Sequence, residues 1–305
     1  MQSVVVTGAR GFIGSHLVDA LLARGDRVTA IDDGSNARHD PPIEVLELDV
    51  RDEAAIARAI ATAAPTAVFH LAAISGVRPS FDRAAEYVSR NVLGTANVLR
   101  ASHLAKVRTV VLTSSSSVYG NRQDARAFRE DDPLESPESP YAASKRAAED
   151  LAGLLAVPYG LRVAATRLFT VYGPRQRPDL AIARFLHAAK SDEELTLYGD
   201  GTATRDYTYV DDAVAGLLAA AAYADAREPG MRIWNLASNR PVRLLDLVAT
   251  IGRVVGRPLK VRHEPRQRGD VGHTWGDLTR ARAELGYAPA VDLETGILRQ
   301  WLAGD

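Results

Sequence analysis

The chain has 305 residues, of which 46% are hydrophobic and 25% are charged, and this length suits one large α/β domain with or without a smaller lobe. Its 37 basic and 38 acidic residues leave a formal charge of -1, which argues against a protein that binds nucleic acid through phosphates. The absence of cysteine excludes disulfides, thiolate catalysis and Cys-ligated zinc, and the seven histidines have no metal-binding spacing, so we expect no metal.

Two features bear on location. A strand is expected at Ser3–Thr7, which leaves no room for a signal peptide before it. The most apolar stretch, Ala213–Ala222, is far shorter than the ~20 residues that a membrane-spanning helix needs. We therefore expect a cytoplasmic protein with neither a membrane nor a nucleic acid as partner.

Short β-rich apolar runs alternate with amphipathic, alanine-rich stretches through the first half of the chain. Strands are predicted at Ser3–Thr7, Arg27–Ile31, Ile43–Leu48, Ala67–His70, Thr109–Thr113 and Val163–Thr166. Helices are predicted at Gly11–Arg24, Asp52–Ala61, Ala84–Leu104 and Tyr141–Ala156. This alternation predicts an α/β fold, a Rossmann doubly wound parallel sheet, with a smaller mixed α/β lobe that binds substrate.

The pattern changes after Arg167, where proline and glycine divide the chain into short pieces. We expect residues 1–168 to form the Rossmann domain, with elements near 206–237 returning to its sheet. Residues 169–305 are expected to form most of the substrate lobe. The polar segment Gln123–Pro140, which contains three prolines, is expected to be a mobile surface loop.

A glycine-rich turn lies between the first strand and the first helix. Gly8, Gly11 and Gly14 let that turn tighten, so that a pyrophosphate can approach the backbone amides at the start of the helix. Asp32 ends the second strand, where a carboxylate can accept hydrogen bonds from both hydroxyls of an adenosine ribose and repel a 2'-phosphate. The arrangement predicts a dinucleotide site that takes NAD rather than NADP.

A phenol and an ammonium group lie one helical turn apart in Tyr141 and Lys145. A lysine beneath the cofactor can raise the acidity of a nearby phenol. Lowering the pKa of tyrosine from ~10 to near 7 requires about 4 kcal/mol of differential stabilisation. A positive nicotinamide ring and Lys145 together could supply it, which indicates acid–base catalysis by Tyr141.

These motifs, in this order, resemble the extended short-chain dehydrogenase/reductase family, specifically its NAD-dependent sugar epimerase/dehydratase branch. The resemblance spans essentially the whole chain, and it includes His70 to Ala73, Asn91 to Thr95 and the segment Ser114 to Gly120. It implies that the Rossmann domain binds NAD and that the second lobe binds a UDP-sugar. It implies cofactor contacts from the first turn, the adenosine end and the dinucleotide wall: Phe12, Ile13, Ser35, Asn36, Arg38, Asp49, Val50, Leu71 and Ala73.

The serine run is informative about the reaction. The resemblance implies that Ser115 shares the proton of the substrate hydroxyl with Tyr141. Dehydratases of this branch carry Asp-Glu after that position, because eliminating water needs a further acid and base, and decarboxylases carry a glutamate two positions on. Here Ser116 and Ser117 follow instead. Dehydration and decarboxylation therefore lack their usual catalytic group, which favours epimerisation, a reaction that needs only proton and hydride transfer.

The position after Phe169 bears on the sugar. Glucose/galactose 4-epimerases of the family usually carry asparagine there, and this chain carries Thr170. Together with the serine run and Arg78, this resembles UDP-glucuronate 4-epimerases, which implies that Ser116, Ser117 and Thr170 bind the uronate carboxylate. Leu168 replaces the aromatic residue usual at its position.

The resemblance also implies a set of groups for the rest of the substrate: Arg177, Arg184, Arg205, Arg266 and Asp270, with Arg268 as an alternative to Arg266. A homodimer built from the helices Ala84–Leu104 and Tyr141–Ala156 is implied in the same way. Three other activities stay open at this point: 4-epimerisation of UDP-glucose or UDP-N-acetylglucosamine, decarboxylation of UDP-glucuronate, and NAD sensing without catalysis.

Overall fold

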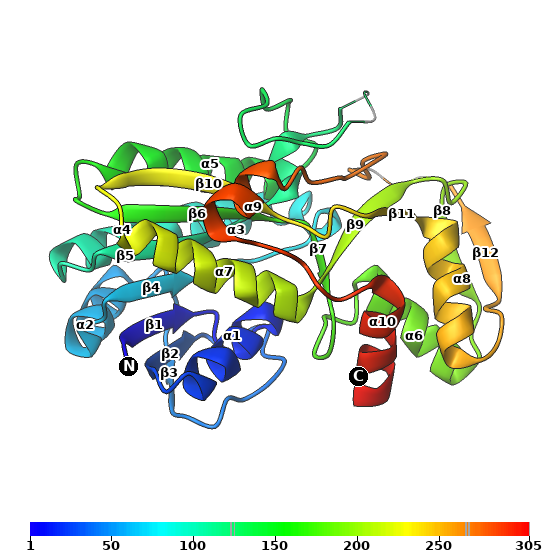
Figure 1. Cartoon of the computed structure of the whole chain (residues 1–305), viewed down its shortest axis with the longest axis horizontal. Coiled ribbons are helices and arrows are strands. Elements are labelled where there is room, and N and C mark those ends of the chain that lie inside the picture. The colour runs from blue at the N-terminus through cyan, green and yellow to red at the C-terminus, as the bar shows by residue number, and fades with distance from the viewer. Residues whose placement is uncertain (123, 125, 266, 268, 305) are drawn as a thin grey trace.

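The computed structural model describes residues 1–304 except 123, 125, 266 and 268. A large parallel sheet with helices on both faces forms one part of the molecule, and a smaller mixed lobe forms the other (Figure 1). The large sheet contains β1 (Ser3–Thr7), β2 (Arg27–Asp32), β3 (Val45–Glu47), β4 (Ala67–His70), β5 (Thr109–Ser115), β6 (Arg162–Leu168) and β10 (Gly230–Leu236). Their order across the sheet is β10-β6-β5-β4-β1-β2-β3, and every pairing is parallel.

This strand order determines where a ligand can bind. The chain moves from β1 toward β2 and β3 on one side, and then crosses back to β4, β5 and β6 on the other. The connections after β1 and β4 therefore leave in opposite directions, which opens a crevice at the carboxyl ends of these two strands. The glycine turn follows β1, and the serine run ends β5, so the sheet brings both to the same edge.

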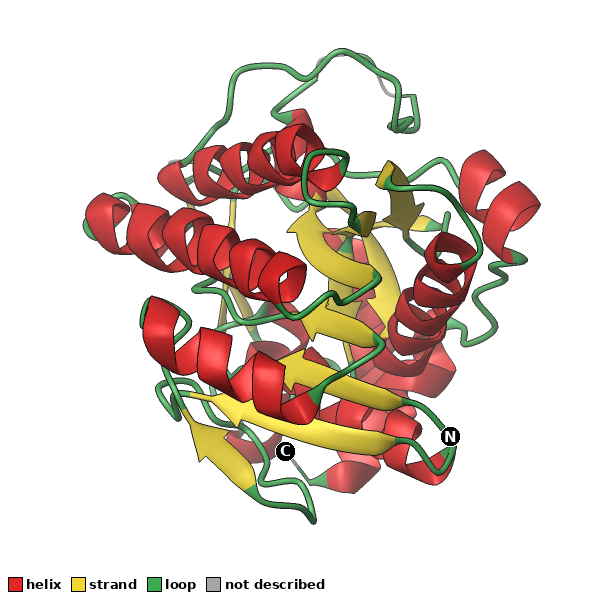
Figure 2. Cartoon of the chain, turned by 90° about the vertical axis from the view of Figure 1, so that its left-hand side faces the viewer, coloured by secondary structure: helices red, strands yellow, loops and turns green. Residues whose placement is uncertain are grey.

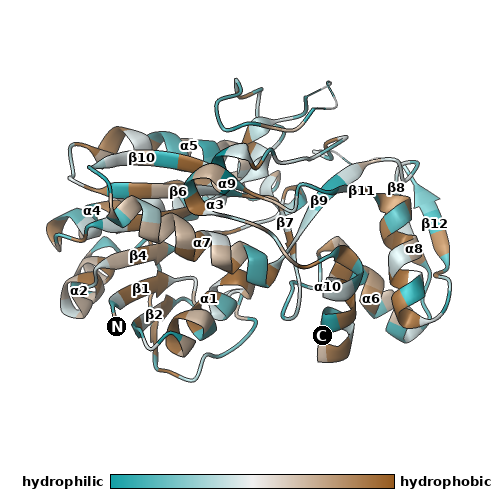
Figure 3. Ribbon diagram, viewed as in Figure 1, coloured by the Kyte–Doolittle hydropathy of each residue, from teal (hydrophilic) through white to brown (hydrophobic). Residues whose placement is uncertain are grey.

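Helices lie on both faces of the sheet (Figure 2), and the side chains of the strands are divided between two apolar layers. In β1, Val4 and Val6 face one layer with α1 (Phe12–Ala23) and α7 (Val210–Asp225), whereas Val5 faces the other layer. The second layer contains α2 (Glu53–Ala63), α4 (Gly94–Leu104) and α5 (Pro140–Ala156). Apolar residues therefore fill the central strands almost continuously, as parallel strands buried on both faces require (Figure 3).

In its described residues, the smaller lobe is built from short strands and three helices. A mixed sheet in the order β11-β9-β7 joins Pro241–Arg243 (β11), Thr204–Tyr209 (β9) and Thr170–Tyr172 (β7), and a parallel pair joins β8 (Leu195–Tyr198) with β12 (Val261–Glu264). The helices are α6 (Ala181–Ser191), α8 (Leu244–Val255) and α10 (Leu293–Ala303), and the short α9 (Thr279–Leu285) packs on α7 and β10. The predicted fold class, a Rossmann sheet with a smaller mixed lobe, is confirmed.

Two stretches differ from the expectation. The single helix expected over Ala84–Leu104 runs as α3 (Ala84–Tyr87), a π-helical turn η2 (Val88–Leu93) and α4. The π turn shifts the register, so that neighbouring side chains at Arg90 and Asn91 can reach different parts of the molecule. The expected mobile loop is wrong in its middle, where Phe128 is fully buried and Glu130 is buried beside Asn235.

The helices of the described parts of the chain do not combine the length and apolar character that crossing a membrane requires.

Candidate active site

A cavity of about 460 Å³ runs along the carboxyl edge of the large sheet and on to the smaller lobe. Its wall joins the first turn, the ends of β4, β5 and β6, the start of α5 and the segment after β12. The sequence-predicted residues that line it are Gly8, Gly11, Phe12, Ile13, Gly14, Asn36, Leu71, Ala73, Ser115, Ser116, Ser117, Tyr141, Lys145, Thr170, Arg177, Arg205 and Asp270. Residues from both halves of the chain thus share one cavity.

The first turn approaches its neighbours too closely for any side chain at two of its glycines. Gly8 has a φ of +74°, and a Cβ there would lie 2.7 Å from the backbone nitrogen of Ala72. A Cβ on Gly14 would lie 1.9 Å from the carbonyl oxygen of Gly8. Because α1 begins at Phe12, the first amides of the helix have no partner within it, and Phe12 and Ile13 line the cavity. This geometry suits a pyrophosphate.

A smaller cavity of about 90 Å³ continues from the first turn along the end of β2. Asp32, Ser35, Asn36 and Val50 line it together with Leu71 and Ala73. The carboxylate of Asp32 accepts the backbone N–H of Arg10 at 2.9 Å and that of Gly34 at 2.8 Å. Burial raises the pKa of Asp32, and these two hydrogen bonds oppose that effect. The carboxylate is thereby held at the end of the strand.

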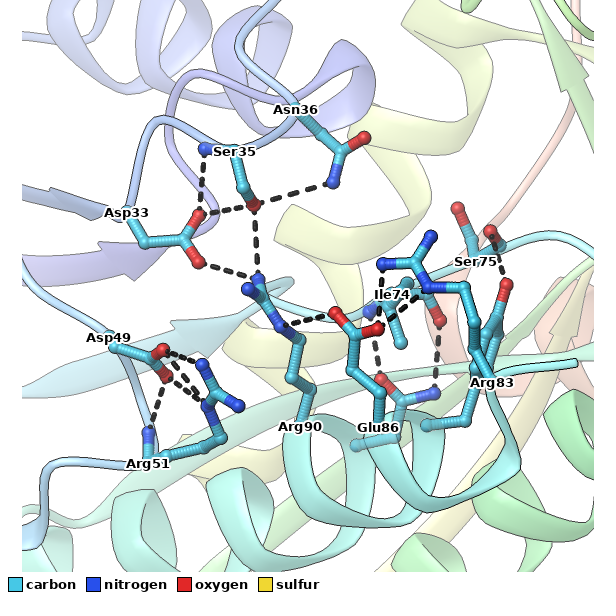
Figure 4. A network of polar contacts seen from close by, with 12 residues as sticks. Asp33, Ser35, Asn36, Asp49, Arg51, Ile74, Ser75, Arg83, Glu86 and Arg90 are labelled. Carbon is cyan, nitrogen blue, oxygen red and sulfur yellow. Dashed lines mark hydrogen bonds and ion pairs between the residues drawn. The ribbon is translucent and has the colours of Figure 1, made fainter. Parts of the chain in front are cut away.

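Two charged residues of this smaller cavity were not predicted. Arg90, from the π-helical turn, pairs with Asp33 at 2.5 Å and donates to Ser35 Oγ at 3.0 Å (Figure 4). Its Nε also lies 3.4 Å from Glu86. Asp33 directly follows Asp32, and Arg90 directly precedes the Asn91 motif. This proximity to predicted residues was the signal in the sequence that could have placed them in the cavity.

Two residues expected near the adenosine do not line either cavity. Asp49 is engaged in an ion pair with Arg51 at 2.5 Å, as Figure 4 shows. Arg38 is exposed, and its backbone N–H donates to the carbonyl of Arg10. Asp49 is thus paired within its own loop, and the Arg38 side chain is exposed.

Ser115, Tyr141 and Lys145 all line the large cavity. Ser115 ends β5, and the other two lie on α5, which begins at Pro140 with Ser139 as its N-cap. The Lys145 ammonium donates to the carbonyl oxygen of Thr113 at 2.8 Å, and burial lowers its pKa to about 8. Burial also raises the pKa of the Tyr141 phenol, while a hydrogen bond with Ser115 and the charge of Arg177 act in the opposite direction.

A buried polar chain supports this centre from below. His70 lies between Thr7 Oγ1 at 2.8 Å and Thr95 Oγ1 at 3.1 Å. Burial, with a smaller effect of Lys145, lowers the pKa of His70 to about 3, so the imidazole is neutral. Asn91 donates to Ser144 Oγ at 2.9 Å and so joins this region to the underside of α5.

Hydroxyl groups line the cavity beside Tyr141. Ser116 and Ser117 belong to the turn η3 (Ser116–Tyr119), and Thr170 begins β7. The buried hydroxyls of Ser117 and of the neighbouring Ser114 have no hydrogen-bond partner among the described residues. Ser114 was not predicted, although it stands first in the serine run. A buried hydroxyl without a partner is costly, because it has lost its hydrogen bonds to water.

The predicted basic residues divide into two groups. Arg177 and Arg205 line the cavity; Arg177 hydrogen-bonds to Ser75 and Asp179, and Arg205 donates to the carbonyl of Val271 at 2.8 Å. Arg78 and Arg184 do not line it: Arg78 lies at its mouth, paired at 3.4 Å with Asp270, and Arg184 is half-buried on α6. Arg266 and its alternative Arg268 lie outside the described residues.

No group of three or more acidic or histidine side chains that could hold a metal ion occurs within the part of the chain that the structure describes.

Comparison with known proteins gives the family. Residues 4–237 match the NAD dependent epimerase/dehydratase family. The chain belongs to this family. It is therefore an enzyme, and NAD is its cofactor, as the sequence predicted.

Three relatives illustrate the range of that family. UDP-glucuronate 4-epimerase 5 of Arabidopsis thaliana is 37% identical over 99% of this chain and 76% of its own length. The structure of MoeE5 in complex with UDP-glucuronic acid and NAD is 37% identical, with a TM-score of 0.89 over 99% of this chain and 98% of that one. The UDP-glucose 4-epimerase of Thermus thermophilus in complex with NAD is 30% identical, with a TM-score of 0.91 over 98% of each chain.

Proposed function

We propose that the protein is an NAD-dependent 4-epimerase of UDP-sugars that interconverts UDP-glucuronate and UDP-galacturonate through a 4-keto sugar. The observation that carries the choice of sugar is the row of cavity hydroxyls at Ser116, Ser117 and Thr170, with the Ser117 hydroxyl buried and unpaired among the described residues. The relatives named as UDP-glucuronate 4-epimerase or bound to UDP-glucuronic acid support it at 37% identity.

The first turn and the smaller cavity fit NAD. Backbone amides at the start of α1 would bind its pyrophosphate, and Phe12 and Ile13 would lie against it. The smaller cavity would take the adenosine, with Asp32 on the ribose and Val50, Leu71 and Ala73 around the ring. Ser35 and Asn36 would add polar contacts there. Arg38 and Asp49 have no part in this proposal, because neither lines a cavity.

Tyr141, Lys145 and Ser115 would carry out the proton transfer. NAD, when bound, supplies the hydride acceptor and donor at C4. Tyr141 would take the proton of the C4 hydroxyl, and the buried Lys145 ammonium would stabilise the phenolate that does so. Ser115 would hold the same hydroxyl by a hydrogen bond. After the 4-keto sugar has rotated so that its other face meets the cofactor, Tyr141 would return the proton to the C4 oxygen.

The cavity hydroxyls would bind the substrate carboxylate. Each hydrogen bond to a charged group contributes ~1.5–3 kcal/mol, so three of them distinguish an acid from an alcohol at C6. Oxidation at C4 makes a β-keto acid, which loses CO2 when the breaking bond aligns with the carbonyl π system. A carboxylate fixed by Ser116, Ser117 and Thr170 would be kept out of that alignment.

The smaller lobe, taken as residues 169–305, would bind the rest of the UDP-sugar. Arg205 and Arg177 would meet the diphosphate end of the substrate from the cavity wall. Asp270 would bind the nucleotide ribose, and its ion pair with Arg78 would then be replaced by that contact. Arg184 would need to turn from the surface of α6 to take part.

We also propose a homodimer. Its interface would be an exposed apolar face on the two helical segments Ala84–Leu104 and Tyr141–Ala156. Leu93 and Leu104 of the first, and Leu154 with Val157 at the end of α5, are between 49% and 75% exposed. Side chains of this size on adjacent helices form a patch that a second copy of the same face could cover.

The cofactor preference follows from Asp32. We expect the protein to bind NAD at least about tenfold more tightly than NADP, because the carboxylate would repel a 2'-phosphate. Asp32→Asn should narrow that difference, whereas Asp52→Asn at the start of α2 should not. Titration of cofactor-free protein by fluorescence or calorimetry measures both affinities. Equal affinities in the unmodified protein would contradict the role of Asp32.

Removal of the Tyr141 hydroxyl should prevent proton transfer and leave the fold intact. We expect Tyr141→Phe to keep its melting temperature and its NAD, and to lower kcat by at least ~100-fold. Tyr223→Phe on α7, which packs against Trp234 away from the cavity, is the matched control. Near-normal turnover by the Tyr141 variant would show that another group is the base.

The substrate is tested by a panel of UDP-sugars. We expect UDP-glucuronate to interconvert with UDP-galacturonate with little UDP-pentose, and UDP-glucose to react with kcat/KM at least about tenfold lower, because its hydroxyl leaves the site unsatisfied. Thr170→Ala should weaken this selection and release more UDP-pentose, whereas Thr62→Ala on α2 should not. Anion-exchange chromatography separates the products. Rapid exchange of UDP-glucose with UDP-galactose beside inert UDP-glucuronate would overturn the choice of acid.

The dimer is tested by sedimentation. We expect a species of twice 32.8 kDa at micromolar concentration. Leu154→Asp should weaken association at least about tenfold by burying a charge at the interface, whereas Leu302→Asp on α10, equally exposed, should leave the dimer intact. A monomeric unmodified protein, or dissociation by the control alone, would contradict this interface.

A further inference from the structure

A buried ion pair lies directly behind the centre of the site. Glu149 on α5 and Arg167 on β6 are each 3% exposed. The guanidinium donates three times to the carboxylate: Nε to Oε1 at 3.0 Å, Nε to Oε2 at 3.2 Å and Nη2 to Oε2 at 2.7 Å. A hydrophobic pair of similar volume is often as stable as a buried ion pair, because both charges lose their water. Stability alone is therefore a weak reason for these two residues.

Their location suggests a better reason. Glu149 lies one helical turn after Lys145, so both side chains leave α5 on its buried face. Lys145 donates to Thr113 of β5, and Arg167 of β6 is paired in the sheet with Ser114, the next residue of β5. Two successive turns of α5 are thus fastened to two neighbouring strands. The carboxylate is held on the same side of the helix as the ammonium.

Arg167 is itself held in place. Its guanidinium lies over the Tyr119 ring, 4.7 Å from the centroid, and donates to the carbonyl of Glu130 at 3.4 Å. The Tyr119 hydroxyl in turn donates to Asn235 at 2.7 Å. Since Arg167 cannot move without breaking these contacts, the Glu149 carboxylate that it binds is held in place, one helical turn from Lys145.

The charges around Lys145 come from few elements. Its own helix carries Tyr141 and Glu149; β4 carries His70, which is neutral above pH 3; β6 carries Arg167; and Arg177 acts on Tyr141 from beyond β7. Among the described residues, Glu149 is the acidic group whose charge acts on Lys145. It opposes the burial that lowers the pKa of that lysine.

We propose that Glu149, fixed by Arg167, is a positioning residue that keeps Lys145 positively charged beneath Tyr141. The inference rests on the proposed function, because the charge of Lys145 matters only if Tyr141 is the base. Glu149 does not line the cavity and contacts neither sugar nor cofactor there. It acts through Lys145.

The direction of the effect follows from charge. Glu149→Gln keeps the shape of the side chain but removes its negative charge, which disfavours the Lys145 ammonium and lowers its pKa. The guanidinium of Arg167 is then uncompensated and disfavours the ammonium further. In the double variant Glu149→Gln with Arg167→Met, both charges are absent, so the pKa of Lys145 should fall by less than in Glu149→Gln alone. Glu130→Gln removes another buried carboxylate of the same network and is the matched control.

The titration of Lys145 can be observed directly, because the chain has only four lysines. The full-length protein, saturated with NAD and labelled with ¹³C at the lysine ε-carbons, should give four signals, and Lys145→Met assigns one of them. We expect the titration midpoint of Lys145 to fall by about one pH unit or more in Glu149→Gln. The double variant should lie between Glu149→Gln and the unmodified protein, and Glu130→Gln should match the unmodified protein.

Turnover gives a second reading. The loss of kcat on the alkaline side should begin about one pH unit lower in Glu149→Gln, while kcat near pH 6 stays within about threefold of normal. An unchanged midpoint, or a uniform loss at every pH, would overturn the proposal in favour of a structural role. If Glu149→Gln does not fold, the titration midpoint of Lys145 in the double variant tests the proposal instead. An unmodified protein inert toward every UDP-sugar would overturn the proposed function, whereas the NMR midpoint would still test Glu149.

Discussion

The parallel pairing of β1, β4, β5 and β6 is the constraint on which the rest of the site depends. Parallel strands end at one edge, so residues more than a hundred positions apart in the sequence meet there. The glycine turn after β1 has to pass within contact distance of the segment after β4, which is why a Cβ on Gly8 would collide with Ala72. Close approach of backbones here excludes side chains and leaves amide groups to bind an anion.

The buried ammonium of Lys145 at this edge restricts the charges of the residues behind it. Lys145 has one hydrogen bond to a carbonyl, and burial lowers its pKa to about 8. A positive charge nearby without a compensating anion would lower the pKa of Lys145 further. His70 is neutral between two threonine hydroxyls, and Glu149 carries the opposing charge while Arg167 compensates that carboxylate. The buried polar residues next to Lys145 thus fit the presence of a buried cation.

Much of this arrangement could be predicted from sequence because it rests on local patterns. Strand and helix periodicity predicted the sheet, and the spacing of Tyr141 and Lys145 predicted two side chains on one helical face. The glycine turn could be recognised since its conformational needs are confined to seven residues. Where the chain departs from regular geometry, as at the π-helical turn that carries Arg90 and Asn91, periodicity gave no warning.

The remaining differences come from competition between partners. Asp49 had a plausible place near an adenine, but Arg51 lies two residues away and pairs with it. Phe128 lies in a polar, proline-containing stretch, yet it packs on Tyr119 with ring centroids 4.7 Å apart. Such outcomes depend on which groups the fold brings within reach, and no single stretch of sequence contains that information.

The chemistry of the cavity wall also fits a substrate that has to turn over. A guanidinium binds a carboxylate in one fixed, bidentate orientation, and it would resist rotation of the keto sugar. Serine and threonine hydroxyls rotate about one bond and can donate from several directions, so they can hold a carboxylate before and after the ring turns. The arginines that line the cavity, Arg177 and Arg205, come from the other lobe. Firm binding at the diphosphate and adjustable binding at the sugar would let one end stay fixed while the other moves.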